Sequence, residues 1–418
     1  MPITHLLHAT VDGEPTDVLI ADGTIVAVAA AGSLAPSPGT DLVELVEVDL
    51  SGHVLLPAAV EPHAHLDKAF LAEVVPNPAG DLHGAIEAMQ AHRHLLTYDD
   101  TVARAERAAR LMARNGYVAV RTHADTVFAD GHGNGLTSIA ALAEVRERVR
   151  GVIDIEIVAL SGIGVVGPAG AGQRALLADA LAAGADLVGG CPHLEGDIEA
   201  ATDVFLQIAS DHGCGVDLHT DETLDPHANG LDVLARRVLA GFDLPATASH
   251  CVSLGQQPDD VQRATAERVA AARVGVVALP HTNLFLQGRG LVPMPRGLTA
   301  VAALRAAGVT LAAGADNVQD PFNPVGRACP FETAGLMVMA AHLLPGDAWR
   351  SVSTEAAAVL GRPGAAGIRA GAPADLLAVP ASTEREAIAF APPERRRWMA
   401  GPVVSTGSTT LVHFHQGG

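Results

Sequence analysis

The sequence predicts an α/β protein, a (β/α)8 TIM barrel with a small β-sandwich domain formed by the N- and C-terminal segments. Its 418 residues are about right for a barrel of roughly 250 residues plus an accessory domain. Through the middle of the chain, short continuous apolar runs alternate with helical segments, as parallel strands buried on both faces require. The two ends of the chain are instead strand-like and rich in turns.

The N-terminal part of the small domain is predicted to cover residues 1–57. Apolar residues at 18–21 and 24–29 flank the dipeptide Asp22-Gly23, which is typical of a β-hairpin. Residues 30–40 form a loop rich in Gly, Pro and Ala, and residues 42–49 alternate again. We therefore expect an antiparallel strand pair followed by a further strand.

The predicted barrel covers residues 58–367. Its eight strands are expected in apolar runs at residues 55–60, 117–122, 155–160, 187–191, 215–218, 246–249, 274–279 and 310–313. Helices are expected between them, among others at residues 136–149, 173–183, 198–212, 228–240, 259–272 and 298–307. The strand pattern returns at residues 374–379 and within 401–413. Residues 368–418 are therefore expected to pair with the N-terminal segment in the small domain.

Composition and charge narrow the range of partners. Hydrophobic residues make up 49% of the chain and aromatic residues only 3%, so a large core must be built from Ala, Val and Leu. Lys and Arg number 27 against 47 Asp and Glu, and the resulting net charge of −20 repels phosphate backbones. Nucleic acid is therefore a poor partner, and a small neutral or cationic substrate is favoured.

The cysteines indicate a reducing compartment. The chain has four, with no C-x-x-C pair among them, and such scattered cysteines do not suggest a disulfide framework. The N-terminus lacks the basic and apolar regions of a signal peptide, and no apolar run of about 18 residues predicts a membrane span. We expect a cytoplasmic protein with no membrane partner, and the sequence leaves a homo-oligomer open.

Polar side chains gather where the predicted strands end. The carboxyl ends of barrel strands open onto one face, where active sites are built. Seven of the 19 histidines are expected on this face, which packing alone does not explain. The polar residues at these ends are Glu61, His63, His65, His123, Asp125, His193, Glu195, His219, Glu222, His250, His281, Asn283 and Asp316.

A metal site is the simplest explanation of these histidines. His63 and His65 are two residues apart on a strand, so both side chains point into the barrel mouth. Two imidazoles, a further histidine and a carboxylate suit zinc or ferrous iron. A lone H-x-H pair is as often part of a hydrogen-bonded polar rim. With His219, His250 and Asp316 at later strand ends, the metal site becomes the better interpretation.

Other residues at this face have two interpretations each. Glu222 is either a surface carboxylate or, beside a metal, a proton shuttle. Asp316 is either a ligand or a helix cap. Lys68 is either a solvated lysine or a group that orients a substrate oxygen or neutralises a carboxylate. Gln287, which follows the seventh predicted strand, is assigned to a substrate-side loop.

These residues stand in stretches that resemble the cytosine deaminase branch of the amidohydrolase superfamily. The matching stretches occur in the family's order, from about residue 55 to 380. They are VEPHAHLD at residues 60–67, RTHAD at 121–125, HTDE at 219–222, ASH at 248–250, LQGR at 286–289 and GADN at 314–317. GAPADL at residues 371–376 resembles the family's return to its β-sandwich.

The resemblance implies one divalent metal ion per chain, Zn or Fe, with His63, His65, His219 and Asp316 as its ligands. A bound metal lowers the pKa of water towards about 7, and the hydroxide adds to a C=N carbon of the substrate with release of ammonia or an amine. The resemblance further implies that His250 hydrogen-bonds this water with Asp316 helping as base. Glu222 would pass a proton to a ring nitrogen.

Several positions depart from the cytosine deaminase pattern on the substrate side. Gly162 stands where that family has a glutamine that grips the pyrimidine. Asn317 replaces a second acidic residue, and Phe322 replaces a tryptophan. Lys68 is closer to the N-isopropylammelide isopropylaminohydrolase side of the branch. These four positions and Gln287 are the candidate substrate-binding residues, and cytosine itself is not the expected substrate.

Three functions are compatible with this site. A metal-dependent hydrolytic deaminase of a cytosine-like or substituted amino N-heterocycle is preferred. A hydrolase of a cyclic or linear amide uses the same barrel, and ring opening instead of ammonia release would identify it. A non-catalytic binding protein with the same fold is a remote alternative, because all the expected ligand and proton-shuttle positions are filled.

Overall fold

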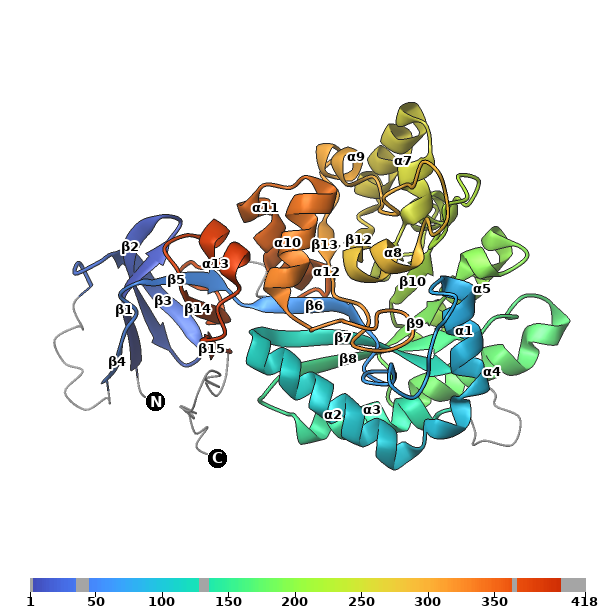
Figure 1. The fold of residues 1–418 in the computed structure, drawn as a ribbon, viewed down its shortest axis with the longest axis horizontal. Helices are drawn as coiled ribbons and strands as arrows, with labels where there is room; N and C mark the ends of the chain where they lie inside the picture. The colour runs from blue at the N-terminus through green and yellow to red at the C-terminus, as the bar shows by residue number, and fades with distance from the viewer. Residues whose placement is uncertain (1–2, 35–44, 128–134, 363–366, 400–418) are drawn as a thin grey trace.

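The computed structural model describes residues 3–34, 45–127, 135–362 and 367–399. Within these ranges the strands form two sheets, and the predicted fold class is confirmed. A strand-rich part built from both ends of the chain lies to one side of a larger part that contains a parallel sheet and its helices (Figure 1). Strand β6 (Ala59–Ala64) leads from the first part into the second (Figure 1).

The parallel sheet has eight strands among the described residues, in the order β6 to β13. The strands after β6 are β7 (Tyr117–Thr126), β8 (Asp154–Ser161), β9 (Leu187–Gly190), β10 (Val216–Thr220), β11 (Ala246–His250), β12 (Gly275–Ala278) and β13 (Leu311–Ala313). The two ends of the sheet meet at a parallel bridge between Ala64 and Asp316. The sheet therefore closes into a barrel, and its carboxyl ends share one rim.

Helices alternate with these strands. The described α-helices are α1 (Leu82–Ala91), α2 (Tyr98–Asn115), α3 (Thr137–Arg148), α4 (Ala171–Ala182), α5 (Ile198–His212), α6 (Gly230–Leu239), α7 (Asp259–Ala272), α8 (Pro280–Leu286), α9 (Val301–Ala306), α10 (Pro330–Ala341), α11 (Pro345–Val352), α12 (Thr354–Val359) and α13 (Glu384–Phe390). Short 3₁₀ segments are η1 (Arg93–Leu95), η2 (Pro168–Gly170), η3 (Pro192–Leu194) and η4 (Val252–Gln256). The apolar side chains of strands and helices form one large core that is rich in Ala, Val and Leu.

The bounds of some helices follow from local signals. Helix α5 is capped at its start by Asp197, whose side chain accepts a hydrogen bond from the backbone N–H of Ala200, and at its end by Gly213 with a φ of 66°. Helix α7 follows Pro258 and carries two acidic residues in its first turn, where the helix dipole favours negative charge. Both helices have the predicted bounds.

The second sheet joins the two ends of the chain. In the described part of the chain its strands are β1 (Ile3–Val11), β2 (Glu14–Ala21), β3 (Thr24–Ala30), β4 (Leu45–Asp49), β5 (His53–Pro57), β14 (Leu376–Pro380) and β15 (Arg396–Trp398). They are ordered β15-β14-β5-β1-β2-β3, with β4 paired to β1. The predicted hairpin around Asp22-Gly23 is confirmed by the pairing of β2 with β3. The strand predicted within residues 401–413 lies outside the described residues.

The prediction that residues 55–60 form a single barrel strand is wrong. Strand β5 ends at Pro57 and belongs to the small sheet, because Leu56 pairs with Leu377 of β14. The backbone N–H of Ala58 donates to the Asp375 carbonyl at 2.9 Å, and β6 begins at the next residue. This change of sheet supports residues 57 and 58 as the domain boundary that we propose.

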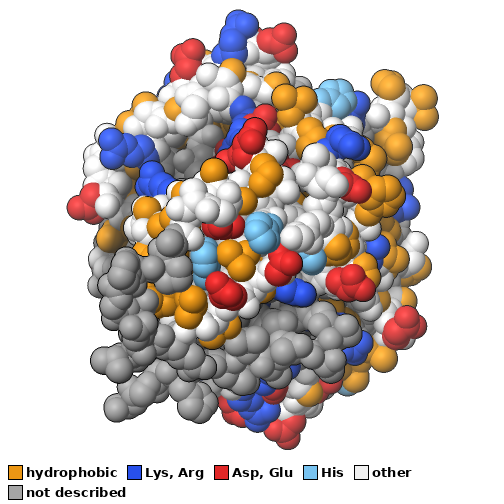
Figure 2. Space-filling view, turned by 90° about the vertical axis from the view of Figure 1, so that its left-hand side faces the viewer, with side chains coloured by type: hydrophobic (Ala, Val, Ile, Leu, Met, Phe, Trp, Pro, Cys, Tyr) orange, Lys and Arg blue, Asp and Glu red, His pale blue; other side chains and the backbone are white. Residues whose placement is uncertain are grey.

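One face of the molecule carries charges of both signs. On the face nearest the small sheet, acidic and basic side chains lie among apolar ones (Figure 2). Across the described ranges, no helix combines the length and apolar character needed to cross a membrane.

Candidate metal centre

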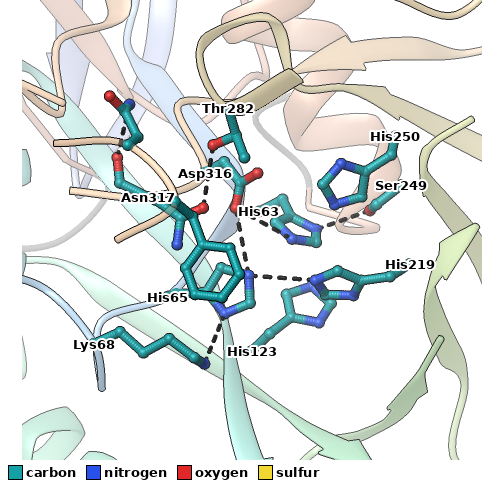
Figure 3. Close-up of polar contacts among 12 residues, drawn as sticks. His63, His65, Lys68, His123, His219, Ser249, His250, Thr282, Asp316 and Asn317 are labelled. Carbon is teal, nitrogen blue, oxygen red and sulfur yellow. Dashed lines mark hydrogen bonds and ion pairs between the residues drawn. The ribbon is translucent and has the colours of Figure 1, made fainter. Parts of the chain in front are cut away.

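Four histidines and an aspartate meet at the carboxyl end of the barrel strands (Figure 3). His63 lies in β6 and His65 directly follows it, His219 lies in β10, His250 ends β11, and Asp316 follows β13. Each of these side chains is buried, with no more than 6% of its surface exposed. The structure thus brings together all five residues that the sequence places in the metal site.

The spacing of the donor atoms fits a divalent cation. His65 Nε2 lies 3.3 Å from His219 Nε2 and 3.4 Å from Asp316 Oδ1. His63 Nε2 lies 3.7 Å from the same oxygen. Such separations suit neighbouring ligands of one ion bound at about 2.0–2.2 Å. Within the described residues, His63 Nε2 and both Asp316 oxygens have no hydrogen-bond partner, which is costly for buried atoms unless something binds them.

Burial also sets the protonation of these groups. It lowers the pKa of His63, His65, His219 and His250 well below the ordinary value, and the charges of neighbouring groups add to the effect. Neutral imidazole is the form that binds metals. Burial raises the pKa of Asp316 to about 8, a shift that a nearby cation would oppose.

A second group of possible ligands, His63, His123 and Asp217, is less suitable for a cation. Asp217 Oδ2 accepts a hydrogen bond from Arg121 Nη1 at 2.9 Å, and its Oδ1 accepts one from the Ser249 hydroxyl at 2.9 Å. The guanidinium of Arg121 would repel a metal ion at this carboxylate. A cation would therefore be better accommodated beside His65 and Asp316.

Backbone contacts hold Asp316 towards the histidines. The φ angles of His250 and Asp316 are 70° and 61°, in the left-handed region that residues other than glycine rarely adopt. The Asp316 N–H donates to the His63 carbonyl at 3.1 Å. The buried Glu61 carboxylate accepts from the N–H of Ala315 at 3.0 Å and from that of His63 at 3.2 Å. Such strain persists where the surroundings fix it, commonly at functional sites.

Glu222 and His250 lie beside each other next to the histidine cluster. Glu222 is 6% exposed, so its interpretation as a surface carboxylate is wrong. The Asn283 side-chain amide donates to Glu222 Oε1 at 3.2 Å and contacts His250 Nδ1 at 3.0 Å. Burial raises the pKa of Glu222 well above its ordinary value, and the nearby Asp316 adds to this shift. The pair is placed where proton transfer to a bound molecule is possible.

Lys68 is buried as well, so its interpretation as a solvated lysine is wrong. Its Nζ lies 2.9 Å from Asp125 Oδ1, 3.4 Å from Asp67 Oδ1 and 3.3 Å from His65 Nδ1. Burial opposes the charge, but the two carboxylates outweigh it and raise the pKa of Lys68. Lys68 therefore neutralises carboxylates at the rim while it faces the cavity.

A cavity of about 260 Å³ opens above the cluster. Its polar lining includes His65, Lys68, His219, Glu222, His250, Thr282, Asp316 and Asn317. Its apolar lining includes Leu82, Ile86, Met89, Val127, Leu160, Ile163, Leu194 and Phe322. The volume is close to the lower end of the range for small-molecule sites, about 300–1,000 Å³.

The structure places most of the predicted substrate-binding residues at this cavity. Lys68, Gly162, Asn317 and Phe322 all line it. Gln287 is not among the lining residues, because its side-chain amide turns away to donate to the Glu222 carbonyl at 3.3 Å. Gln287 thus supports the backbone of Glu222.

One wall of the cavity and the supporting roles of several buried residues were not predicted from the sequence. The wall comes from α1, and the supports include Ser249 and Asn283. The sequence signal for Asn283 is its place as a polar residue after a predicted strand. The signal for Ser249 is its place directly before His250. The spacing of Leu82, Ile86 and Met89 would have indicated a helical apolar face. His281, expected at the rim, instead contacts the Thr333 hydroxyl of α10 at 3.1 Å.

A barrel with buried histidines and an aspartate at its rim is typical of metal-dependent hydrolases. Comparison with known proteins identifies the family. Residues 90–409 match the model of the amidohydrolase family. The chain belongs to this family of metal-dependent hydrolases, which act on carbon–nitrogen bonds. It is 35% identical over 370 residues to a pterin deaminase of Rhizobium rhizogenes (strain K84 / ATCC BAA-868), and the match covers 86% of this chain and 81% of that protein.

Solved structures give the same assignment. The 5-methylcytosine deaminase of Klebsiella pneumoniae, liganded with 5-fluorocytosine, superposes with a TM-score of 0.84 and 27% identity. That match covers 98% of this chain and 99% of the other. The N-isopropylammelide isopropylaminohydrolase of Burkholderia multivorans ATCC 17616 superposes with a TM-score of 0.81 and 32% identity, over 98% and 100% of the two chains. The predicted superfamily branch is confirmed.

Proposed function

We propose that this chain is a hydrolytic deaminase that cleaves a C–N bond of an amino-substituted N-heterocycle and releases ammonia or an amine. The observation that carries the proposal is the cluster of imidazoles with Asp316, at separations of 3.3 to 3.7 Å, beside the paired Glu222 and His250. Three similar proteins are named as deaminases or an aminohydrolase of such rings, which supports this reaction.

One divalent ion, Zn or Fe, would be held by His63, His65, His219 and Asp316. When bound, it would supply a water molecule activated near neutral pH. His65 must change its tautomer for this role. Its Nδ1 accepts from Lys68 at 3.3 Å, so the neutral ring carries its proton on Nε2. Ligation through Nε2 would require the proton on Nδ1 instead.

The chain's own groups supply the proton transfers. Glu222 is buried and faces the cavity, so it is placed to give a proton to a ring nitrogen of the bound substrate. His250 presents Nε2, which has no partner in the described part of the chain, to the cavity. Asp316 has free oxygens beside these groups and can accept a proton. The apolar wall keeps the substrate ring out of water.

The substrate is proposed to be larger than cytosine. Gly162 lines the cavity without a side chain, and a Cβ atom built there would only make ordinary contacts with Val127 at 3.4 Å. The glycine therefore leaves space that a glutamine would fill. The 35% identity to a pterin deaminase favours a bicyclic amino-pteridine over a single ring. Hydrolysis of a cyclic amide stays the second candidate, because the same barrel and metal site serve it.

The test compares kcat/KM for pterin, cytosine, 5-methylcytosine and N-isopropylammelide with metal-loaded protein, by measuring release of ammonia or amine. We expect pterin to exceed cytosine, and Gly162→Gln to shift the ratio towards cytosine. A cytosine value of roughly 10⁴ M⁻¹s⁻¹ or higher that exceeds the others would contradict the argument from Gly162. Ring opening without ammonia would favour the amide hydrolase. The cytoplasmic location and the homo-oligomer stay predictions from the sequence.

A further inference from the structure

We propose that Ser249 and Asn283 set opposite tautomers on two histidines of the metal centre. Ser249 would make His63 a metal ligand through Nε2, and Asn283 would make His250 a hydrogen-bond donor through Nε2. The inference rests on the proposed function and assigns positioning roles to two buried residues.

The contacts of His63 fix its proton on Nδ1. Its Nδ1 lies 2.9 Å from the Ser249 hydroxyl (Figure 3). That hydroxyl donates its single proton to Asp217 Oδ1 at 2.9 Å, and Arg121 holds the other carboxylate oxygen. The Ser249 oxygen can therefore only accept from His63, so Nδ1 carries the proton. The Nε2 lone pair of His63 then faces the cluster, 3.7 Å from Asp316 Oδ1.

The contacts of His250 fix the opposite tautomer. Its Nδ1 lies 3.0 Å from Asn283 Nδ2, which also donates to Glu222 Oε1 at 3.2 Å. The structure turns the amide nitrogen, and not the amide oxygen, towards both neighbours, and Asn283 Oδ1 has no partner within the described residues. An amide nitrogen only donates, and His250 Nδ1 must accept. Its Nε2 consequently carries the proton and has no partner within the described residues.

The two tautomers give neighbouring imidazoles different chemistry. A lone pair on His63 Nε2 binds a cation, whereas an N–H on His250 binds an oxygen or nitrogen of water or substrate. Although the structure brings His63, His219 and His250 close enough to ligate one ion together, this arrangement excludes His250 from the ligand set. A partner on the far ring nitrogen is a known means of orienting metal-binding histidines.

The first experiment measures metal affinity by chelator competition with Zn²⁺ as the probe. Ser249→Ala should weaken Zn²⁺ binding about 10- to 100-fold, the usual effect of losing such an outer partner. Ser253→Ala is the matched control. Its buried hydroxyl lies 2.7 Å from the carbonyl oxygens of both Asp225 and Ala228, either of which can accept its proton. The control should keep wild-type affinity, and thermal unfolding of the metal-free variants would show that both fold.

The second experiment separates Asn283 from the metal ligands. Asn283→Leu keeps the approximate shape and removes the donor, and Asn283→Ala serves if the leucine variant does not fold. We expect Zn²⁺ affinity and KM to stay at wild-type values while kcat falls about 10²-fold or more, as for loss of a general acid–base group. A purely structural role would instead lower affinity and kcat together.

Each result has a distinct meaning. Wild-type Zn²⁺ affinity in Ser249→Ala would overturn the role of Ser249. Wild-type kcat in Asn283→Leu, or a loss of Zn²⁺ affinity equal to that of Ser249→Ala, would overturn the role of Asn283. If the unmodified protein binds no Zn²⁺ and releases no ammonia from any ring, the proposed function itself fails.

Discussion

Glu222 and His250 are joined through Asn283 and lie at the edge of the cavity. Neither belongs to the apolar core, so their replacement should affect turnover and leave the fold intact. We predict that Glu222→Gln and His250→Asn each lower kcat by about 10²-fold or more. Steady-state kinetics with the true substrate and thermal unfolding check this. Near-normal turnover in Glu222→Gln would remove it from proton transfer.

Lys68 has a stabilising role that is separate from any contact with substrate. It is 4% exposed and is the cation between the carboxylates of Asp67 and Asp125. Lys68→Met should lower the free energy of unfolding by about 3–5 kcal/mol, because it leaves buried charges unpaired. Urea unfolding measures this. Arg150→Met breaks the exposed pair with Glu147 and should change stability little. Equal stability of the two variants would contradict the buried ion pair.

For single residues, the sequence predicts the chemical role of a side chain better than it predicts the burial and contacts of that side chain. The histidines of the cluster could be predicted, because their positions at strand ends determine where they point. The alternatives for Glu222 and Lys68 stayed open because burial depends on partners distant in sequence, such as Asn283 and Asp125. The position of Gln287 was mispredicted for the same reason, since a loop residue can turn to either side.

Helix α1 is the element that shapes the substrate side of the cavity. Leu82, Ile86 and Met89 share one face at helical spacing and line the apolar wall. Ile86→Trp should reduce the space available and lower kcat/KM for pterin more than for cytosine. Parallel kinetics with both rings measure this ratio. Glu87→Trp places the same side chain on the exposed neighbouring position and should leave the ratio unchanged. Equal losses for the two rings would show that α1 does not select ring size.

Among the elements, local signals decide which bounds can be predicted. Helices α5 and α7 have their predicted bounds because acidic residues at their starts and a glycine after α5 mark their ends. The join of β5 and β6 carries Pro57, which can end a strand, but no polar turn residues separate the apolar residues on its two sides. The pairing of β5 with β14, as of Leu56 with Leu377 more than 300 residues away, divides this run between two sheets.

In the whole molecule, closure of the barrel assembles the site. The bridge between Ala64 and Asp316 joins the two ends of the barrel sheet, which brings the Asp316 carboxylate, after β13, to His63 and His65 at the end of β6. The alternation of strands and helices allowed this arrangement to be predicted, because parallel strands place their carboxyl ends on one rim. The packing of α1 over that rim could not be predicted, since the order of elements does not determine how a loop and its helix fold back.

We propose that the cluster at this rim binds one catalytic divalent metal ion. Elemental analysis of the purified protein, paired with ammonia release before and after chelation, tests it most directly. We predict about one equivalent of Zn or Fe per chain, loss of activity on removal, and recovery on adding the ion back. Replacement of His65 or Asp316 by Ala should abolish both metal and activity. Metal-free protein that retains full hydrolase activity would contradict the account.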